Sequence, residues 1–348
     1  MAPLTRFRVN DNHEVLPMAA QYYGQRACVP GTLLISEATL VSKQAGGYAN
    51  VPGIYTQAQI DAWKPITETV HKQGSFIYLQ LWALGRVANP DFAEKNGITI
   101  HSASATSLGE GYATPKEMTV DEIKQRVEEF AQAAKNAVEA GFDGVEIHGA
   151  NGYLVDQFLQ DVTNKRTDSY GGSVENRSRF AVEITQAVAQ AIGADKTGIR
   201  LSPFSEFQGM KMEDPLPQFS DIIKKLDVLN LSYLHLVDAR VASEAGVDGY
   251  EALDPLLPHY SGALLIAGGL KADSARKMIE ANRQRDIVAV FGRYFISTPD
   301  LAYRLRKGIE FNPYDRDTFY VPKSEKGYID YPFSREWNEE GAAVQVGA

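Results

Sequence analysis

The sequence lacks several features that would place it in a specialised class of protein. It contains one cysteine, Cys28, so an internal disulfide is excluded and a reducing, cytoplasmic compartment is predicted. The formal net charge is -9 at pH 7 and no lysine- or arginine-rich block occurs, so neither nucleic acid nor an anionic membrane is an expected partner. No apolar run approaches the roughly 20 residues that span a bilayer, and the first residues do not form a signal peptide.

Length and composition indicate a large buried core. The 348 residues are 44% hydrophobic and 23% charged, which suits one α/β barrel or two to three smaller domains. A doubly wound sheet would need a glycine-rich phosphate loop after an early strand, and no G-x-G-x-x-G sequence occurs. The barrel is therefore the favoured architecture.

Short apolar segments alternate with segments of helical periodicity along the chain. The expected strands cover residues 1–4, 32–35, 76–81, 144–147, 198–201, 233–237, 264–267 and 287–291. The expected helices cover residues 17–27, 57–72, 119–140, 174–192, 215–226, 250–259, 272–282 and 299–307. Eight apolar strands, each followed by a helix, predict an α/β fold with a parallel sheet closed into a single (β/α)8 barrel.

The barrel is expected to form one domain with one long insertion. Residues 83–118, after the third strand, are rich in Gly, Ser, Thr and Asn and should form an irregular lid over the barrel mouth. The domain is predicted to cover residues 1–335, and residues 336–348 are predicted to be a frayed, flexible tail.

The run His148-Gly149-Ala150-Asn151-Gly152-Tyr153 follows a buried strand and brings an imidazole, an amide and a phenol to one turn. Such a group can polarise a carbonyl oxygen and supply a proton nearby. The same six residues also fit a strand end with a capping asparagine and a packed tyrosine. The run alone leaves both interpretations open.

Glycines and an arginine end the last two strands. Gly268 and Gly269 follow the seventh strand, and Gly292 and Arg293 follow the eighth, where barrels of this type commonly bind phosphate. Each pair alone would fit an ordinary turn, but the two together with the arginine favour an anion site. Gln80 and Arg200 add an amide and a buried cation, so flavin mononucleotide (FMN) fits the pattern. No cluster of metal ligands occurs at the strand ends, and no metal is expected.

Several of these motifs, in this order, resemble the Old Yellow Enzyme flavoproteins, and most closely their fungal and yeast branch. The similar segments are residues 2–6, 80–82, 148–153, 166–168, 170–177, 200–203, 291–293 and 314–320. In that family a hairpin over the barrel floor precedes the segment that here begins at Ala2. The resemblance therefore implies a shortened first strand and no such hairpin in this sequence.

The resemblance implies a cofactor and a role for each matching residue. It implies non-covalent FMN, with NADPH as hydride donor. The implied cofactor-binding residues are Pro3, Leu4, Thr5, Gln80, Arg200, Gly268, Gly269, Gly292 and Arg293. His148 and Asn151 would donate to the carbonyl oxygen of the substrate and Tyr153 would be the proton donor. The implied walls of the substrate pocket are Trp82, Phe207 and Tyr320.

The implied activity is that of an NADPH dehydrogenase and ene-reductase. It would reduce the activated C=C bond of small α,β-unsaturated carbonyl compounds by a ping-pong mechanism, as a monomer or homodimer. Two alternatives stay open: a flavin-dependent isomerase or reductase of a fungal secondary-metabolite pathway, and a shortened barrel that has lost flavin and activity. The retained Tyr153 favours the reductase, because related isomerases can carry phenylalanine there.

Overall fold

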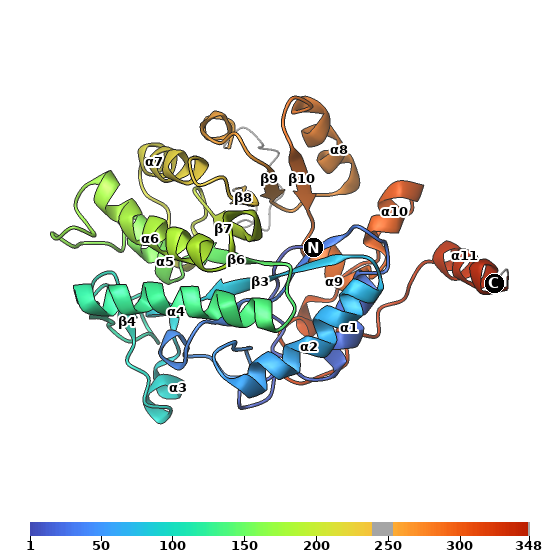
Figure 1. Ribbon diagram of the computed structural model, residues 1–348, viewed down its shortest axis with the longest axis horizontal. Helices are drawn as coiled ribbons and strands as arrows, with labels where there is room; N and C mark the ends of the chain where they lie inside the picture. The colour runs from blue at the N-terminus through green and yellow to red at the C-terminus, as the bar shows by residue number, and fades with distance from the viewer. Residues whose placement is uncertain (239–252, 347–348) are drawn as a thin grey trace.

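The computed structural model describes residues 1–238 and 253–346. Its strands are β1 (Leu33–Ile35), β2 (Thr39–Leu40), β3 (Phe76–Trp82), β4 (His101–Ser102), β5 (Lys116–Glu117), β6 (Gly144–Gly149), β7 (Thr197–Leu201), β8 (Tyr233–Val237), β9 (Leu264–Ala267) and β10 (Ile287–Val290). The main sheet is parallel in the order β1-β3-β6-β7-β8-β9-β10, with β2 paired to β3. It curls into a barrel-like arc with helices around it (Figure 1). The predicted α/β barrel is confirmed.

The helices lie outside this sheet. They are α1 (Met18–Arg26), α2 (Gln57–Lys72), α3 (Pro90–Lys95), α4 (Val120–Glu139), α5 (Leu154–Leu159), α6 (Val174–Ile192), α7 (Leu216–Asp227), α8 (Ala272–Ala281), α9 (Arg293–Ser297), α10 (Leu301–Lys307) and α11 (Arg335–Val346). Capping boxes at Thr56 and Thr119 begin α2 and α4, since each threonine and the residue at the third helical position satisfy each other's backbone N–H.

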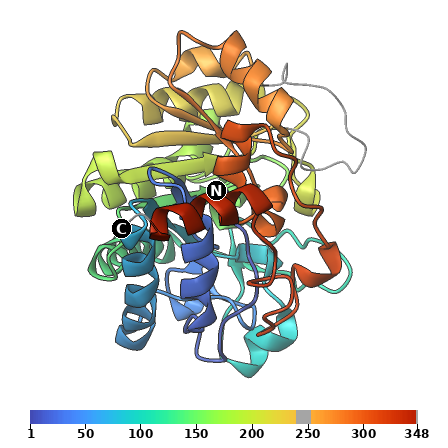
Figure 2. The same cartoon turned by 90° about the vertical axis from the view of Figure 1, so that its right-hand side faces the viewer.

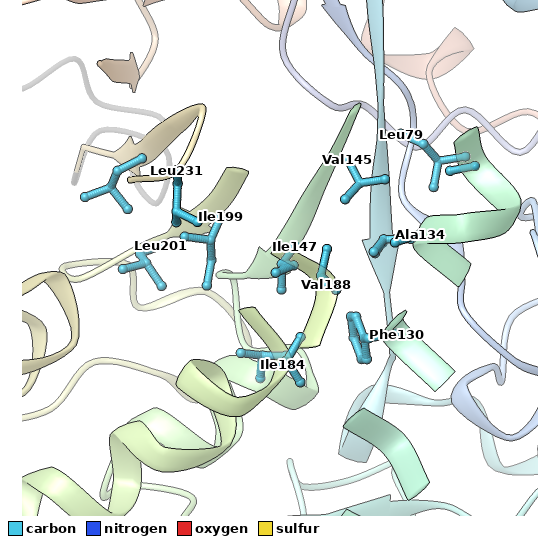
Figure 3. Packing of buried hydrophobic residues seen from close by; sticks show 14 of the residues in the cluster. Leu79, Phe130, Ala134, Val145, Ile147, Ile184, Val188, Ile199, Leu201 and Leu231 are labelled. Carbon is cyan, nitrogen blue, oxygen red and sulfur yellow. The ribbon is translucent and has the colours of Figure 1, made fainter. Parts of the chain in front are cut away.

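The main hydrophobic core lies between the strands and the helices that surround them, among them α4 and α6. Phe130 of α4 and Ile184 of α6 point toward the strands, where Val145, Ile147 and Ile199 face them (Figure 3). All five side chains are fully buried. The spacing of the apolar residues along α4 and α6 places them on one helical face, and this packing fixes β6 and β7 beneath the site described below.

The first four residues differ from the predicted strand. They form no strand; Ala2 N donates to Phe291 O at 2.9 Å, Ile35 N donates to Met1 O at 3.0 Å, and the Met1 amino group donates to Leu33 O at 2.7 Å. The segment therefore bridges the end of β10 and β1 with three hydrogen bonds, too few to form a strand. This arrangement brings Pro3, Leu4 and Thr5 to the point where the two edges of the sheet meet.

One other expectation also requires correction. Of the helix predicted at 250–259, residues 250–252 lie outside the described part, and the remainder forms only a 3₁₀ turn at Leu257–His259. Pro255 and Pro258 explain this, because proline inside a helix removes a hydrogen bond and clashes with the preceding turn. Most of the C-terminal segment, predicted to be a flexible tail from residue 336, is helical in α11, and Glu340 pairs with Lys307 at 2.7 Å.

The two ends of the described chain meet at a pair of buried arginines, Arg6 and Arg8. All five N–H groups of the Arg8 guanidinium donate to backbone carbonyls, one on Arg6 and four between Thr318 and Lys326, at 2.6–3.0 Å. Arg6 donates to Phe319 O and Gly327 O. We call the segment 318–327, which surrounds the two cations, the carbonyl cage. Figure 2 shows the C-terminal part of the chain passing close to the N-terminus.

Candidate active site

The residues of the His148–Tyr153 turn come together where β6 ends and α5 begins. The ring centroids of His148 and Tyr153 are 4.8 Å apart with their planes at 68°. Trp82, at the end of the neighbouring strand β3, lies edge-on to Tyr153 at 4.9 Å and nearly parallel to His148 at 6.5 Å. The imidazole, the phenol and one predicted wall residue thus form a single cluster at the carboxyl end of the sheet.

The electrostatic surroundings of His148 make its imidazole a neutral donor. Burial lowers its pKa well below the usual value, and the charge on Arg200 and the nearby His235 lower it further. The Ala150 N–H lies 3.4 Å from Nδ1, which therefore acts as the acceptor. The ring proton of the neutral tautomer is then on Nε2, which can donate to a ligand oxygen.

Asn151 is held in a left-handed backbone conformation beside His148. Its φ angle is 58°, in the left-handed region, and its N–H donates to Ser202 Oγ at 2.7 Å. Its side-chain Oδ1 is buried without a hydrogen-bond partner among the described residues. A buried amide in this state is suited to bind a polar ligand group.

Tyr153 lies near three other phenols, of which Tyr320 was predicted from the sequence and Tyr48 and Tyr112 were not. Burial raises the pKa of Tyr153, and the nearby Tyr48, Tyr320 and Tyr112 raise it further. Tyr153 is therefore a protonated phenol at neutral pH and can act as a proton donor. Tyr48 also contacts Trp82, with ring centroids 6.0 Å apart. No periodicity marks Tyr48 or Tyr112 in the sequence, because both lie in irregular loops.

The other two predicted wall residues lie at the surface. Phe207 is 53% exposed on a short turn after β7, and Tyr320 is 63% exposed in the carbonyl cage. Tyr320 packs edge-on against Phe7 at 6.0 Å. Both rings are thus available to a ligand. Of the two, Tyr320 lies near enough to the Tyr153 phenol to raise its pKa.

A polar layer fills the barrel interior below this cluster. Glu146 accepts hydrogen bonds from Gln80 Nε2 at 2.7 Å and from His235 Nδ1 at 2.8 Å. Burial alone would raise the pKa of Glu146, but His235, Arg200 and Gln80 hold it below the usual value. The Oε1 atom of Gln80 takes no part in this bond, so it can accept a hydrogen bond from an N–H group of an adjacent ligand.

Arg200 completes the polar layer on β7. It is paired in register with His148 on one side and His235 on the other. Its Nε is buried and has no hydrogen-bond partner among the described residues. Because a buried guanidinium N–H without an acceptor is unfavourable, this position is suited to a ligand that carries an acceptor or a negative charge.

The glycine and arginine positions of β9 and β10 lie next to one another. Gly269 has φ 69°, and a Cβ built on it would lie 3.7 Å from Arg293 Nη2. Gly268 cannot be replaced without strain, because a Cβ there would lie 2.6 Å from Asp238 Cβ. These backbone positions and the guanidinium form a cradle that a side chain would fill and that suits an anion.

The cradle adjoins the N-terminal segment. A Cβ built on Gly292 would contact Leu4 Cδ2 at 3.6 Å and Ala2 Cβ at 3.7 Å. Pro3 is buried and Thr5 is half-buried beside it. The predicted cofactor-binding residues therefore form two groups, one in the polar layer and one around the cradle. A ligand with a polar heterocycle and a phosphate fits both, since the heterocycle can meet the unpaired donor of Arg200 and the phosphate can lie in the cradle. Within residues 1–238 and 253–346, no group of His, Cys, Asp or Glu side chains is arranged to hold a metal ion.

Comparison with known proteins shows the family to which the chain belongs. Residues 1–312 match the NADH:flavin oxidoreductase / NADH oxidase family, and the chain belongs to this family of FMN-dependent, Old Yellow Enzyme-type oxidoreductases. The family implies FMN as the cofactor. None of the described helices is both long and apolar enough to cross a membrane.

Particular relatives come from fungi and bacteria. The chain is 53% identical to the chanoclavine-I aldehyde reductase fgaOx3 of Penicillium roqueforti, over 100% of this chain and 95% of that protein. It is 52% identical to the NADP-dependent oxidoreductase lnbE of Aspergillus flavus, over 96% and 92% of the two chains. Its structure is similar to that of the Old Yellow Enzyme homologue of Zymomonas mobilis, with a TM-score of 0.89, 35% identity, and coverage of 95% and 94%.

Proposed function

We propose that this protein is an FMN-dependent ene-reductase, which takes hydride from NADPH and reduces the C=C bond of an α,β-unsaturated carbonyl compound. The observation that carries the proposal is the contact between the neutral His148 imidazole and the protonated Tyr153 phenol, with their rings 4.8 Å apart. One group can donate a hydrogen bond to a carbonyl oxygen while the other delivers a proton two bonds away.

FMN would be bound non-covalently by the two groups of residues described above. Gln80 and Arg200 would contact the pyrimidine side of the ring, Pro3, Leu4 and Thr5 its edge, and the cradle of Gly268, Gly269, Gly292 and Arg293 the phosphate. When bound, FMN supplies the hydride. Release of the flavin from the acid-precipitated protein would test the non-covalent attachment, and we expect the released species to be FMN and not FAD.

The residues of this chain would then control the substrate. His148 Nε2–H and the Asn151 amide would donate to the carbonyl oxygen, stabilising the negative charge that develops there as hydride reaches the β-carbon. Tyr153 would transfer its phenolic proton to the α-carbon. Trp82, Phe207 and Tyr320 would hold the flat substrate and exclude water.

The names of the relatives narrow the substrate class. fgaOx3 is named as an aldehyde reductase and lnbE as an NADP-dependent oxidoreductase. We therefore infer that the substrate is an α,β-unsaturated aldehyde of a fungal secondary-metabolite pathway, with NADPH as the reductant. By composition we assign the enzyme to the cytoplasm.

Product analysis tests this function directly. Purified holoenzyme is incubated with NADPH and an α,β-unsaturated aldehyde, and the products are separated by chromatography. We expect the saturated aldehyde, with one NADPH consumed per product. An allylic alcohol would show reduction of C=O instead, and a rearranged product without NADPH consumption would show an isomerase.

A further inference from the structure

One buried amide links the His148–Tyr153 turn to the insertion after β3. The side chain of Gln157, on α5, is fully buried. Its Nε2 donates to Gly152 O at 2.7 Å and to Leu84 O at 3.1 Å. Its Oε1 accepts from Arg86 N at 3.1 Å and from Ser102 Oγ at 2.8 Å. Both amide hydrogens and both oxygen lone pairs are thus in use.

Gln157 contacts the peptide groups on both sides of Tyr153. Its side chain binds the Gly152 carbonyl, which belongs to the peptide before Tyr153, and its backbone N–H donates to Tyr153 O at 2.8 Å. The backbone of Tyr153 is therefore held at two points by one residue. A third bond, from Leu154 N to Ala83 O at 3.1 Å, attaches the same turn to the beginning of the insertion.

Close packing holds the side-chain amide of Gln157 in one position. Gly85 has φ 65°, and a Cβ there would lie 2.1 Å from Gln157 Oε1, so the backbone of the insertion approaches the amide directly. Gly152 has φ 76° and its own Cβ would meet Gln208 Cβ and Met210 Cγ, both at 2.9 Å. A side chain at Gly85 would separate the surfaces that Gln157 joins, and one at Gly152 would clash with the loop after β7.

We propose that Gln157 is a positioning residue for the proton donor Tyr153, and that its amide fixes the segment 84–102 of the insertion relative to that phenol. The proposal rests on the function proposed above. Gln157 does not touch the substrate. It acts by setting the backbone from which Tyr153 projects, so that a shift of the insertion shifts the proton donor with it.

The test is a double-mutant cycle with Tyr153. Gln157→Met keeps the length of the side chain and removes the amide, and Gln157→Glu keeps the Oε1 acceptor and removes both donors. Because small misplacements of a reacting group are costly, we expect each variant to slow enone reduction in the oxidative half-reaction about tenfold or more. In a Tyr153→Phe background, the same change should slow it no further.

The matched control is Gln59→Met. Gln59 is also a buried amide that binds three backbone groups, those of Tyr55, Thr56 and Asn12, but it lies at the start of α2, away from the turn. We expect it to lower thermal stability without changing the enone step. If Gln157→Met slowed the step by the same factor with and without Tyr153→Phe, or if Gln59→Met slowed it equally, the proposal would be overturned.

Hydrogen exchange supplies a readout that does not depend on the reaction. In Gln157→Met, amide exchange should rise together in segments 84–102 and 152–154, and in Gln59→Met it should rise in neither. Exchange that rises in one segment only would refute the link. If Tyr153→Phe alone leaves enone reduction unaffected, the proposed function fails, whereas the exchange result still decides whether Gln157 joins the two segments.

Discussion

The two sides of the candidate site are built on parts of the barrel that differ in burial. β6, which carries the His148 turn, is buried at every position, and α6 above it buries seven side chains. β10, which leads to the anion cradle, is only half-buried over most of its length, with Val288 47% exposed, and α8 buries two side chains, Ala275 and Met278.

This difference in burial separates the groups proposed to perform the reaction from those proposed to bind the anion. Local stability follows buried apolar contact, so the groups proposed to perform the reaction lie on the more stable part. The cradle, formed by backbone groups and Arg293, lies on the less buried part. A ligand that binds there stabilises the native state by mass action, and we expect β9 and β10 to gain most from it.

The largest expected effect concerns the reaction itself and should leave the cradle unchanged. Tyr153→Phe removes the proposed proton donor, and a general acid contributes roughly 10²- to 10⁴-fold to its step. Stopped-flow kinetics should show enone reduction slowed by this factor, with flavin reduction by NADPH and FMN content nearly unchanged. Equal slowing of both half-reactions would instead assign Tyr153 to cofactor positioning.

The ionisation of Asp156 shows whether the more buried side of the site excludes water. Its carboxylate accepts from Gly152 N and Gln160 Nε2, both at 2.8 Å, and burial raises its pKa to about 7. The folded state therefore binds a proton that the unfolded state releases near pH 4. Stability should fall as the pH rises from about 4 to about 7 and level off above it.

The contribution of Asp156 to this fall is up to about 4 kcal/mol. Asp156→Asn, which cannot ionise, should lose that part of the slope, as measured by denaturant unfolding at several pH values. Glu37, whose pKa burial also raises to about 7, should contribute a similar slope that the variant keeps. An unchanged profile in Asp156→Asn would mean that the carboxylate is already ionised in the folded protein.

A smaller effect is expected for the two proposed oxygen-binding groups. Phenolates should bind between His148 and Asn151 and give a long-wavelength charge-transfer band with the flavin. Because a hydrogen bond to a charged group contributes about 1.5–3 kcal/mol, His148→Ala and Asn151→Ala should each weaken phenolate binding by about 10- to 100-fold. Full binding by either variant would remove that residue from the pocket.

The smallest effect is expected at the cradle. Arg293 is half-buried, so solvent screens its charge, and Arg293→Ala should raise the Kd for FMN by about tenfold. Hydrogen exchange should then increase in β9 and β10 but not in β6. Arg285→Ala is a matched control, because Arg285 precedes β10 instead of following it and binds the carbonyls of Leu257 and Tyr260. Equal loss of FMN in the control would contradict the assignment.

Local patterns predicted the long helices and the buried strands and failed for the short helices. β8, β9, α2 and α6 have the predicted bounds, because hydrophobic periodicity and caps lie within each segment. The short helices α3, α5 and α9 were not predicted, since one or two turns carry too little periodicity and are stabilised by tertiary contacts.

In the candidate site, too, the sequence predicted some residues and not others. Motifs placed His148, Asn151 and Tyr153 in one turn, because they are adjacent in sequence. Tyr48 and Gln157 were not singled out, because their relation to that turn depends on hydrogen bonds and ring contacts between separate segments. Their positions relative to the turn depend on the overall fold, and no local sequence pattern indicates them.

The carbonyl cage also bears on how the protein folds during synthesis. The Phe319 carbonyl that Arg6 and Arg8 share lies 313 and 311 residues further along the chain. At roughly 5–20 residues per second, translation takes about 15 to 60 s to reach it. During this time the two guanidinium groups, which are fully buried in the finished protein, lack the carbonyls of the cage and must stay hydrated. The N-terminal edge of the sheet can therefore close only when nearly the whole chain has left the ribosome.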